Sequence, residues 1–374
     1  MSTIETNIFP LLNLEALSSK YNLYKIKGLN QGNQTENDEI YRRVNSLVTD
    51  LSYNLQIPVT SIQEGETHFL VVRDDAENVP PFFDDVRNGR LLLEKCNKTY
   101  DLNYAERSPN NDKICIKFFQ FMLREPLGND RRLWSPGAGR PFYELNPYPI
   151  DNRILQYTGF KPRIVTTHDG GLGVCVDVTH RHTSIKPLPT YLKREDFSRW
   201  ENRYFIYRYG YKWYQIKAGY LSELNVSETM IKVEDELVSL LDYIGSKTEK
   251  PFPAELLNLP PDAAVIGYRN NRKEVREAPA ALCYQVFGPH DAIMKKYHQE
   301  AILQPDERRP LIHKYVQKHL KNLRFGNTNL KISDQPLTIP ARKFVVPDLE
   351  FANNHILSVR GTKNSHHVSL DNLI

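Results

Sequence analysis

Long apolar runs are absent from this sequence of 374 residues, since none approaches the roughly 18 consecutive apolar residues that a membrane-spanning helix needs. The N-terminus lacks the basic stretch and apolar segment of a secretory leader. Cysteine is also scarce, because the chain has only 4, widely spaced and without a CxxC pair. This usage argues against a disulfide framework or a zinc site. We therefore expect a cytoplasmic protein whose thiols are reduced.

Common catalytic and cofactor motifs are missing as well. The sequence has no P-loop, no Rossmann glycine fingerprint, no GxSxG nucleophile turn and no HExxH zinc motif. His180 and His182 lie close together but have no third ligand at useful spacing. We expect no cofactor, no metal and no catalytic residue in this chain. A metal-dependent nuclease of unrecognised fold is the alternative.

The composition is that of a globular protein, with 40% hydrophobic and 25% charged residues. A chain of this length can form several domains, each with its own core. The net charge of +4 hides an asymmetry. The first 110 residues hold 11 Lys and Arg against 16 Asp and Glu, whereas the rest hold 38 against 29. A polyanionic partner would therefore meet the last two thirds of the chain.

A β-hairpin is predicted between residues 164 and 178. Ile164–Thr167 and Leu172–Val178 are rich in β-branched residues, and Gly170 and Gly171 supply the turn between them. Apolar and polar residues alternate in the second strand, which indicates one buried face. The exit of this hairpin, residues 179–187, is basic and rich in histidine and hydroxyl groups.

The N-terminal part predicts an α+β fold with mixed or antiparallel sheets. Apolar residues recur at helical spacing in residues 39–55. Alternating or β-branched residues predict strands over 21–27, 67–72 and 113–123. A short helix is expected between residues 84 and 96.

Two later segments combine cations with rings or with an apolar face. Residues 203–220 interleave six tyrosines with four cations, a composition that suits stacking on bases and contact with phosphates. From Gln299 a helix is predicted whose apolar face is opposite its lysines. The candidate nucleic-acid-binding residues are Arg181, His182, Lys186, Arg208, Tyr209, Lys212, Tyr214, Lys217, Lys314, Lys318, Lys321 and Arg324. The simpler alternatives are a solvated loop, half-buried tyrosines and a solvated lysine face.

Four short motifs lie in and before the hairpin, namely Gly139-Arg140, Phe142-Tyr143, Gly159-Phe160 and Asp177-Val178-Thr179-His180. In their order and spacing they resemble the region of Argonaute and PIWI proteins where the N domain passes into the first linker.

Two further stretches are similar to the same family. Tyr209 and Tyr214 fall at positions of a strand pair of the PAZ domain, and Glu236–Ile244 resembles the helix that follows it. Residues 256–283 resemble the exit from that domain, but the chain left for it is short, so a reduced PAZ-like module is expected. Pro347, Leu349 and Phe351 fit the second linker, whereas Ala352-Asn353 replaces the usual glycine.

The resemblance implies an Argonaute-like N-terminal lobe, comparable to the APAZ-type partners of short prokaryotic Argonautes. Its expected parts are an N domain (1–160), linker 1 (161–198), a small β-rich PAZ-like domain (199–285), linker 2 (286–352) and a tail (353–374). It would form a heterodimer with a MID-PIWI polypeptide and hold a guide RNA or DNA with its target in guide-directed silencing or prokaryotic immunity. The alternative is a scaffold of the MID-PIWI chain with little nucleic-acid contact.

Overall fold

The computed structural model describes residues 2–29, 34–85, 89–102, 109–137, 141–167, 171–209, 212–233, 236–246, 259–269, 275–288, 291–294, 297, 303–341, 349–351 and 355–357. Residues 7–336 form one compact unit. A second unit joins residues 1–6 to residues 337–374. In it β1 (Ser2–Glu5) pairs with β22 (Thr338–Ala341), and β23 (Leu349–Phe351) pairs with β24 (His355–Leu357). β24 lies within the segment predicted as a tail.

A five-stranded antiparallel sheet and one long helix make up the first part of residues 7–336. The strand order is β4-β5-β3-β7-β6. The bounds are β3 (Ser19–Lys27), β4 (Thr60–Glu64), β5 (Thr67–Arg73), β6 (Phe82–Asp85) and β7 (Gly89–Leu102). α2 (Gln34–Leu55) buries its apolar stripe, including Val44, Leu47 and Leu51, against this sheet. The helix over 39–55 and the strands over 21–27 and 67–72 are thus confirmed.

The predicted short helix between residues 84 and 96 is wrong, because this stretch forms the hairpin of β6 and β7. Leu91 and Leu93 are buried while Arg90 and Leu92 are exposed. That alternation is the period of a strand with one face on a core.

The predicted strand over 113–123 is also wrong, since these residues lie in α3 (Pro109–Asn129). The buried positions are Ile114, Cys115, Phe118, Phe119, Met122 and Leu123, which is helical spacing. β-Branched and aromatic residues favour strands, but the packing of this wide apolar face against the main core overrides the local preference.

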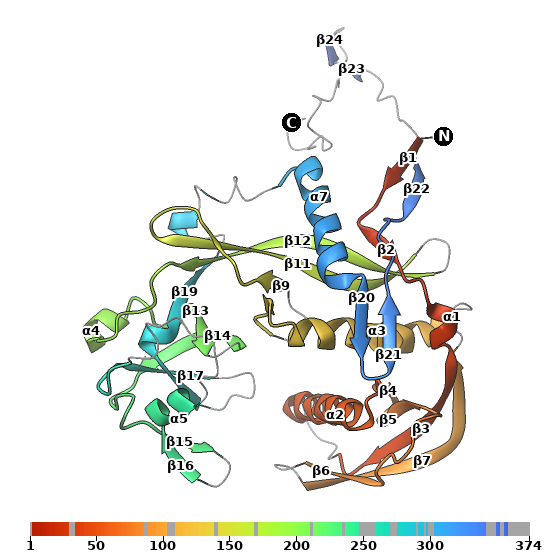
Figure 1. Cartoon of the computed structure of the whole chain (residues 1–374), viewed down its shortest axis with the longest axis horizontal. Helices are drawn as coiled ribbons and strands as arrows, with labels where there is room; N and C mark the ends of the chain where they lie inside the picture. Colours follow the sequence, from red (N-terminus) through yellow and green to blue (C-terminus); the bar gives the residue numbers. More distant parts are fainter. Residues whose placement is uncertain are drawn as a thin grey trace. The chain divides into compact units, whose positions relative to one another are not determined.

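The predicted hairpin is confirmed and is longer than expected. β11 (Ile154–Thr166) and β12 (Leu172–Ser184) pair along their whole length, so the basic exit over 179–184 is paired strand rather than a free linker. The turn residues His168–Gly170 lie outside the described residues. The hairpin lies inside an antiparallel sheet ordered β18-β17-β14-β13-β19-β12-β11-β9-β8 and connects its two parts (Figure 1).

The remaining strands of this sheet are shorter than the two hairpin strands. They are β2 (Ile8–Pro10), β8 (Leu133–Trp134), β9 (Phe142–Glu144), β10 (Tyr148–Pro149), β13 (Tyr204–Tyr209), β14 (Lys212–Leu221), β17 (Val265–Arg269), β18 (Val275–Pro279) and β19 (Cys283–Phe287). β2 pairs with β12, and β10 pairs with β11. Gly159 pairs with Tyr143 across β11 and β9, and a Cβ atom on Gly159 would meet the Phe142 carbonyl oxygen at 2.2 Å. Glycine is therefore required at position 159 by the close approach of β9.

A second core lies under β13, β14 and β17 and contains Phe205, Ile216 and Val265. Around it lie α4 (Arg194–Phe197), β15 (Met230–Val233), β16 (Glu236–Ser239), α5 (Leu240–Ser246) and a 3-10 turn, η2 (Ala280–Leu282). The helix predicted over 236–244 therefore begins only at Leu240, because the preceding residues pair with β15.

The last part of residues 7–336 packs back onto the first. α7 (Pro305–Tyr315) continues into a π-helical turn, η4 (Val316–Leu320), and then the hairpin of β20 (Asn322–Phe325) and β21 (Thr328–Lys331). Figure 1 shows α7 beside the β11–β12 hairpin, and its contacts reach β12. Ile312, Val316 and Leu320 are buried, which confirms the predicted apolar face of the helix. Leu323, predicted on the same helix face, is also buried but lies in β20, because the helix has ended at Leu320. The described helix starts at Pro305, where Gln304 and Glu307 form a capping box.

The short elements α1 (Leu14–Leu17) and η3 (Ala292–Met294) complete the described chain.

Candidate nucleic-acid interface

A large groove of about 1500 Å³ opens within residues 7–336. One wall is formed by α2, β4 and α3, and the other by β13, β14, β15, β17 and β18. The floor includes the segment from Leu133 to Gly137. We call this feature the groove.

Positive charge predominates along the groove. Its basic lining residues are Lys117, Arg124, Lys232, Arg269 and Arg276, against the two carboxylates of Glu125 and Glu277. Lys117 Nζ donates a hydrogen bond of 2.9 Å to the Ser61 carbonyl oxygen, which holds the ammonium group at the wall. Although Arg124 reaches solvent, the groove partly desolvates it and lowers its pKa, while Tyr41 and Glu125 oppose that shift.

Aromatic rings line the groove as well, among them those of Tyr214 on β14, Tyr243 on α5 and Tyr268 on β17. Burial, followed by the nearby Tyr243 hydroxyl, raises the pKa of Tyr214, and burial with Cys283 raises the pKa of Tyr268 to about 12. The phenols of Tyr214 and Tyr268 are therefore neutral at physiological pH. The tyrosine rings offer stacking surfaces to bases or sugars, and the cations can meet phosphates.

Of the twelve candidate residues named from the sequence, Tyr214 is the one that lines the groove. Its partner Tyr207, opposite on β13, is only 6% exposed and belongs to the second core. Tyr204 and Tyr220 are exposed outside the groove. The tyrosine-rich segment therefore divides between core and surface.

Three other candidates make structural contacts. Arg181 donates a hydrogen bond to the side chain of Gln215, and His182 Nε2 lies 2.9 Å from Gln156 Oε1. Arg208 lies over the Trp213 ring at 4.2 Å and the Tyr284 ring at 4.9 Å. The Arg181 contact joins the open end of the hairpin to β14, the His182 contact lies within the hairpin, and the Arg208 contacts join β13 to β14 and β19.

Trp134 is the centre of an aromatic cluster at this junction. Its ring lies 4.8 Å from Tyr143, 5.5 Å from Tyr157 and 5.2 Å from Trp213. Stacked and edge-on aromatic pairs of this kind stabilise a packed junction. Arg181 on β12 and Arg208 on β13 contact side chains of this junction, and these contacts add to its packing.

Lys186 and Lys217 are exposed. The side chains of Tyr209 and Lys212 lie outside the described residues, as do Gly139 and Arg140 of the predicted entry motif and Pro347 of the second linker.

The basic face of the last helix is largely engaged. Lys314 is exposed, whereas Lys318 Nζ lies 2.5 Å from Glu144 Oε1 and Lys321 Nζ lies 3.1 Å from Asp334 Oδ2. Arg324 Nε donates a hydrogen bond of 3.0 Å to the Gly326 carbonyl oxygen. A charge reversal at Lys318 or Lys321 would therefore break an ion pair as well as remove a cation.

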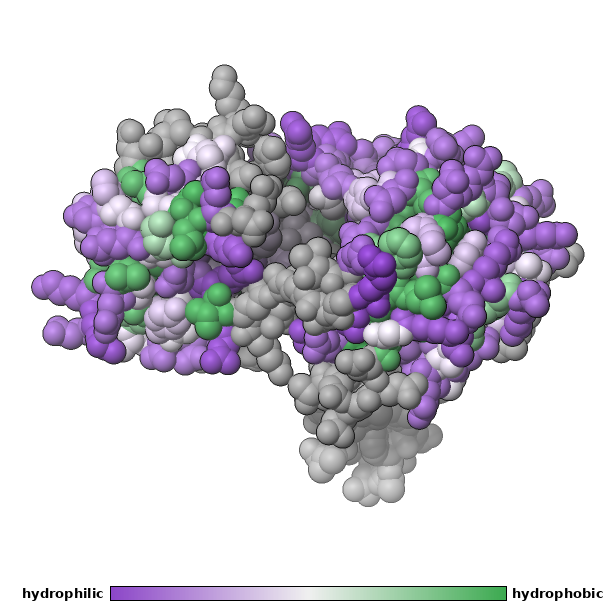
Figure 2. All heavy atoms as spheres, turned by 90° about the horizontal axis from the view of Figure 1, so that it is seen from below, coloured by the Kyte–Doolittle hydropathy of each residue, from purple (hydrophilic) through white to green (hydrophobic). Residues whose placement is uncertain are grey.

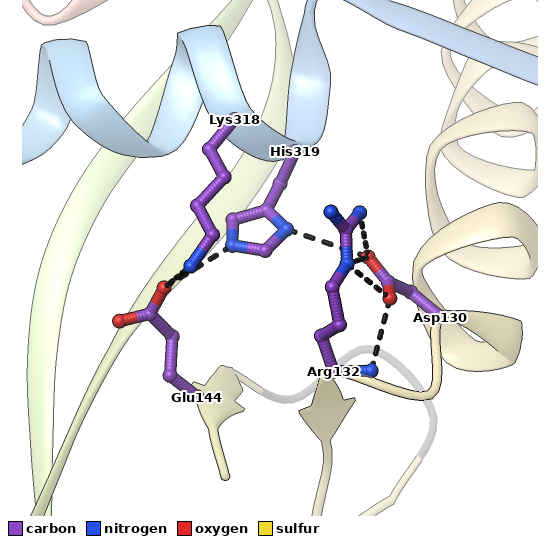
Figure 3. Close-up of polar contacts among 5 residues, drawn as sticks. All are labelled: Asp130, Arg132, Glu144, Lys318 and His319. Atoms are coloured by element: carbon purple, nitrogen blue, oxygen red, sulfur yellow. Dashed lines mark hydrogen bonds and ion pairs between the residues drawn. The ribbon is translucent and has the colours of Figure 1, made fainter. Parts of the chain in front are cut away.

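His319 follows Lys318 in the same turn, and its side chain is fully buried between two carboxylates (Figure 3). Its Nδ1 atom is 3.4 Å from Asp130 Oδ2, and its Nε2 atom is 3.4 Å from Glu144 Oε1. Burial lowers the pKa of His319 and outweighs the two carboxylates, which raise it. Hydrogen bonds from Arg132 are the main reason that the pKa of Asp130 falls to about 2. At neutral pH the imidazole is therefore neutral and the carboxylates are charged.

The groove residues other than Tyr214 are missed by the sequence because they come from separate elements. Lys117 and Arg124 are seven residues apart and so share one face of α3. This spacing of two cations could have indicated a basic helix face, but the sequence predicts a strand over residues 113–123.

Figure 2 shows a face that is mostly hydrophilic, with apolar side chains in small separate groups.

Among the residues that the structure describes, no three His, Cys, Asp or Glu side chains are placed to hold a metal ion. None of the described helices has the length and apolar character needed to cross a bilayer.

Comparison with solved structures identifies the fold. The chain is similar to Drosophila Piwi, with a TM-score of 0.50 and 11% identity over 90% of this chain and 43% of Piwi. A Clostridium butyricum Argonaute bound to a guide DNA and a 19-mer target DNA gives a TM-score of 0.49, with 14% identity over 90% and 44% of the two chains. Aa-Ago with externally bound siRNA gives 0.47, with 13% identity over 90% and 44%.

The sequence matches no protein-family model and no curated protein sequence. The chain spans less than half the length of the Piwi and Argonaute chains to which it is similar. The architecture is α+β and Argonaute-like, as the sequence predicts.

Proposed function

We propose that this chain is the N-terminal lobe of a split Argonaute, which pairs with a MID-PIWI polypeptide and helps to hold a guide strand and its target. In this proposal the chain is not itself a catalyst. The complex acts in guided defence against invading nucleic acid, with a guide of RNA or DNA.

The single observation that carries the nucleic-acid part is the groove. Five basic residues against two acidic ones attract a polyanion, and tyrosine rings in the groove offer stacking surfaces. Contacts to phosphate hold a strand in place but carry no sequence information. That suits a protein whose specificity comes from pairing between guide and target.

The test is the salt dependence of binding to a short duplex. In the variant Arg124→Gln/Arg269→Gln/Arg276→Gln we expect weaker binding and a salt slope smaller by roughly one for each phosphate contact that is lost. Titration of a fluorescent duplex at several salt concentrations measures both quantities.

The matched control is Lys193→Gln/Arg194→Gln/Lys331→Gln, which removes the same charge from exposed positions outside the groove. Equal salt slopes for the two triple variants would contradict the assignment of the groove. If neither variant nor the parent chain binds duplex, even with its partner present, the scaffold alternative is favoured.

A further inference from the structure

A second hollow, of about 410 Å³, lies where the end of α3 meets η4 and β20. Four of its lining residues are basic: Arg132, Lys318, Lys321 and Arg324. Among the described lining residues, Asp130 is the only acidic one. We call this feature the cationic hollow.

The opposite charges in this region differ in their access to solvent. The side chains of Asp130 and Glu144 are each only 16% exposed, whereas those of Arg132, Lys318 and Lys321 are 62%, 43% and 52% exposed. The carboxylates of Asp130 and Glu144 therefore lie beneath the surface and the cations above it, while Asp334, whose side chain is 42% exposed, stays beside Lys321. An anion that approaches the hollow meets guanidinium and ammonium groups first.

The buried imidazole of His319 connects the two carboxylates. The charged and titratable groups described around it are Asp130 after α3, Arg132 before β8, Glu144 on β9, Tyr315 on α7 and Lys318 on its own turn. Phe160 of β11 stacks on the ring at 5.5 Å. A neutral imidazole can donate one hydrogen bond and so serves one carboxylate at a time, whereas an imidazolium donates to both.

We propose that the cationic hollow binds a phosphate group, that Arg132 and Lys318 turn from Asp130 and Glu144 toward the phosphate, and that His319 takes up one proton, which offsets one of the two carboxylate charges. In this exchange two cations turn away from the carboxylates and one proton arrives, so the imidazolium offsets one of the two carboxylate charges and donates a hydrogen bond to each carboxylate. His319 is neutral before binding, since burial lowers its pKa, and is therefore free to accept that proton.

Phosphate fits this hollow better than a carboxylate-bearing peptide does. Its oxygens can meet several cations at once, and the guanidinium groups of Arg132 and Arg324 can form paired hydrogen bonds with it. The source is either a free phosphate or a phosphodiester of a nucleic acid. The cationic hollow is separate from the groove, because Leu127 is the one described residue that lines both features. Phosphate binding in the hollow therefore does not depend on the groove.

The experiment is calorimetric titration of the full chain with inorganic sulfate, a tetrahedral dianion that does not titrate near neutral pH. Repeating it in two buffers of different ionisation enthalpy gives the number of protons taken up. We expect uptake of up to about one proton per anion, and an affinity that rises by up to about tenfold per pH unit as the pH falls below neutrality.

Arg132→Gln/Arg324→Gln should weaken sulfate binding at least several-fold, and His319→Gln should abolish proton uptake. Arg276→Gln in the groove should leave both unchanged, so failure of the groove and failure of the hollow are distinguishable. Binding without proton uptake by the parent chain, which needs no variant, would overturn the exchange. Unchanged affinity in Arg132→Gln/Arg324→Gln would overturn the site.

Competition distinguishes the sources of the phosphate. A short single strand without terminal phosphates that displaces sulfate identifies a phosphodiester ligand, whereas failure to displace it identifies a small free anion. Binding of poly-glutamate with no binding of sulfate or of the strand would overturn the phosphate assignment in favour of an acidic protein.

Discussion

At the scale of single residues, Gly159 shows how closely β9 approaches the hairpin. The Cβ atom of an alanine would lie 2.2 Å from the Phe142 carbonyl oxygen and 2.7 Å from the Tyr143 ring, so the backbone must shift. We expect Gly159→Ala to lower the free energy of unfolding by about 1–3 kcal/mol. Urea denaturation measures this difference.

Gly128 is the matched position, since nothing lies within 4 Å of its Cβ site in α3. Gly128→Ala should raise stability by about 0.5–1 kcal/mol, because alanine loses less backbone entropy in a helix. If the two variants had the same effect, the close approach at Gly159 would not be the cause.

Single residues also determine how the folding stability around His319 depends on pH. Its folded pKa lies below the unfolded value of 6.5, so the unfolded chain takes up the proton first and stability falls as the pH drops below about 6.5. Asp130, with a folded pKa of about 2 against 3.8, adds stability that is present above 3.8 and is lost toward pH 2. We expect His319→Gln to reduce the loss of stability below about pH 6.5 and to leave the loss toward pH 2 unchanged. Denaturation at a series of pH values measures both.

His313→Gln is the control, because it removes another imidazole from the same helix, one that meets the edge of Phe9. A parallel pH profile for His319→Gln and the parent chain would show that His319 does not titrate with unfolding.

At the scale of elements, η4 is anchored by Leu320, which is fully buried in the main core. Leu320→Ala should cost about 2–5 kcal/mol through lost contacts and a cavity. Gln317→Ala, on the exposed side of the same turn, should change stability by less than about 0.5 kcal/mol. Thermal unfolding compares the two, and similar melting temperatures would argue against docking of this turn.

Helices and strands could be predicted from the sequence where the hydrophobic pattern fits one type of secondary structure and not the other. The β11–β12 hairpin and the helix over 39–55 have clear periods and clear turn or polar boundaries. α3 could not be predicted, because the run from Ile114 to Leu123 is apolar enough to hide its period, and only packing selects the helix. The groove was missed for a related reason, since a single Arg269 or Arg276 gives no signal until β17 and β18 bring it opposite α3.

At the scale of the whole molecule, the chain matches somewhat less than half of the Piwi and Argonaute chains. If the split-lobe proposal holds, the tagged chain purified from its host carries a MID-PIWI polypeptide and short nucleic-acid strands. Mass spectrometry and sequencing of the bound material identify both. Recovery of the chain alone and free of nucleic acid would contradict the proposal.

The main core also joins the two ends of the unit formed by residues 7–336. β2 pairs with β12, Leu11 bridges to Ile332, and Phe9 and Leu11 share their core with Tyr315 and Val316. A ribosome adds about 5–20 residues per second, so the first of these residues waits on the order of tens of seconds for the last. During translation the nascent chain therefore carries an open apolar face, which makes it a substrate for chaperones until α7 has emerged.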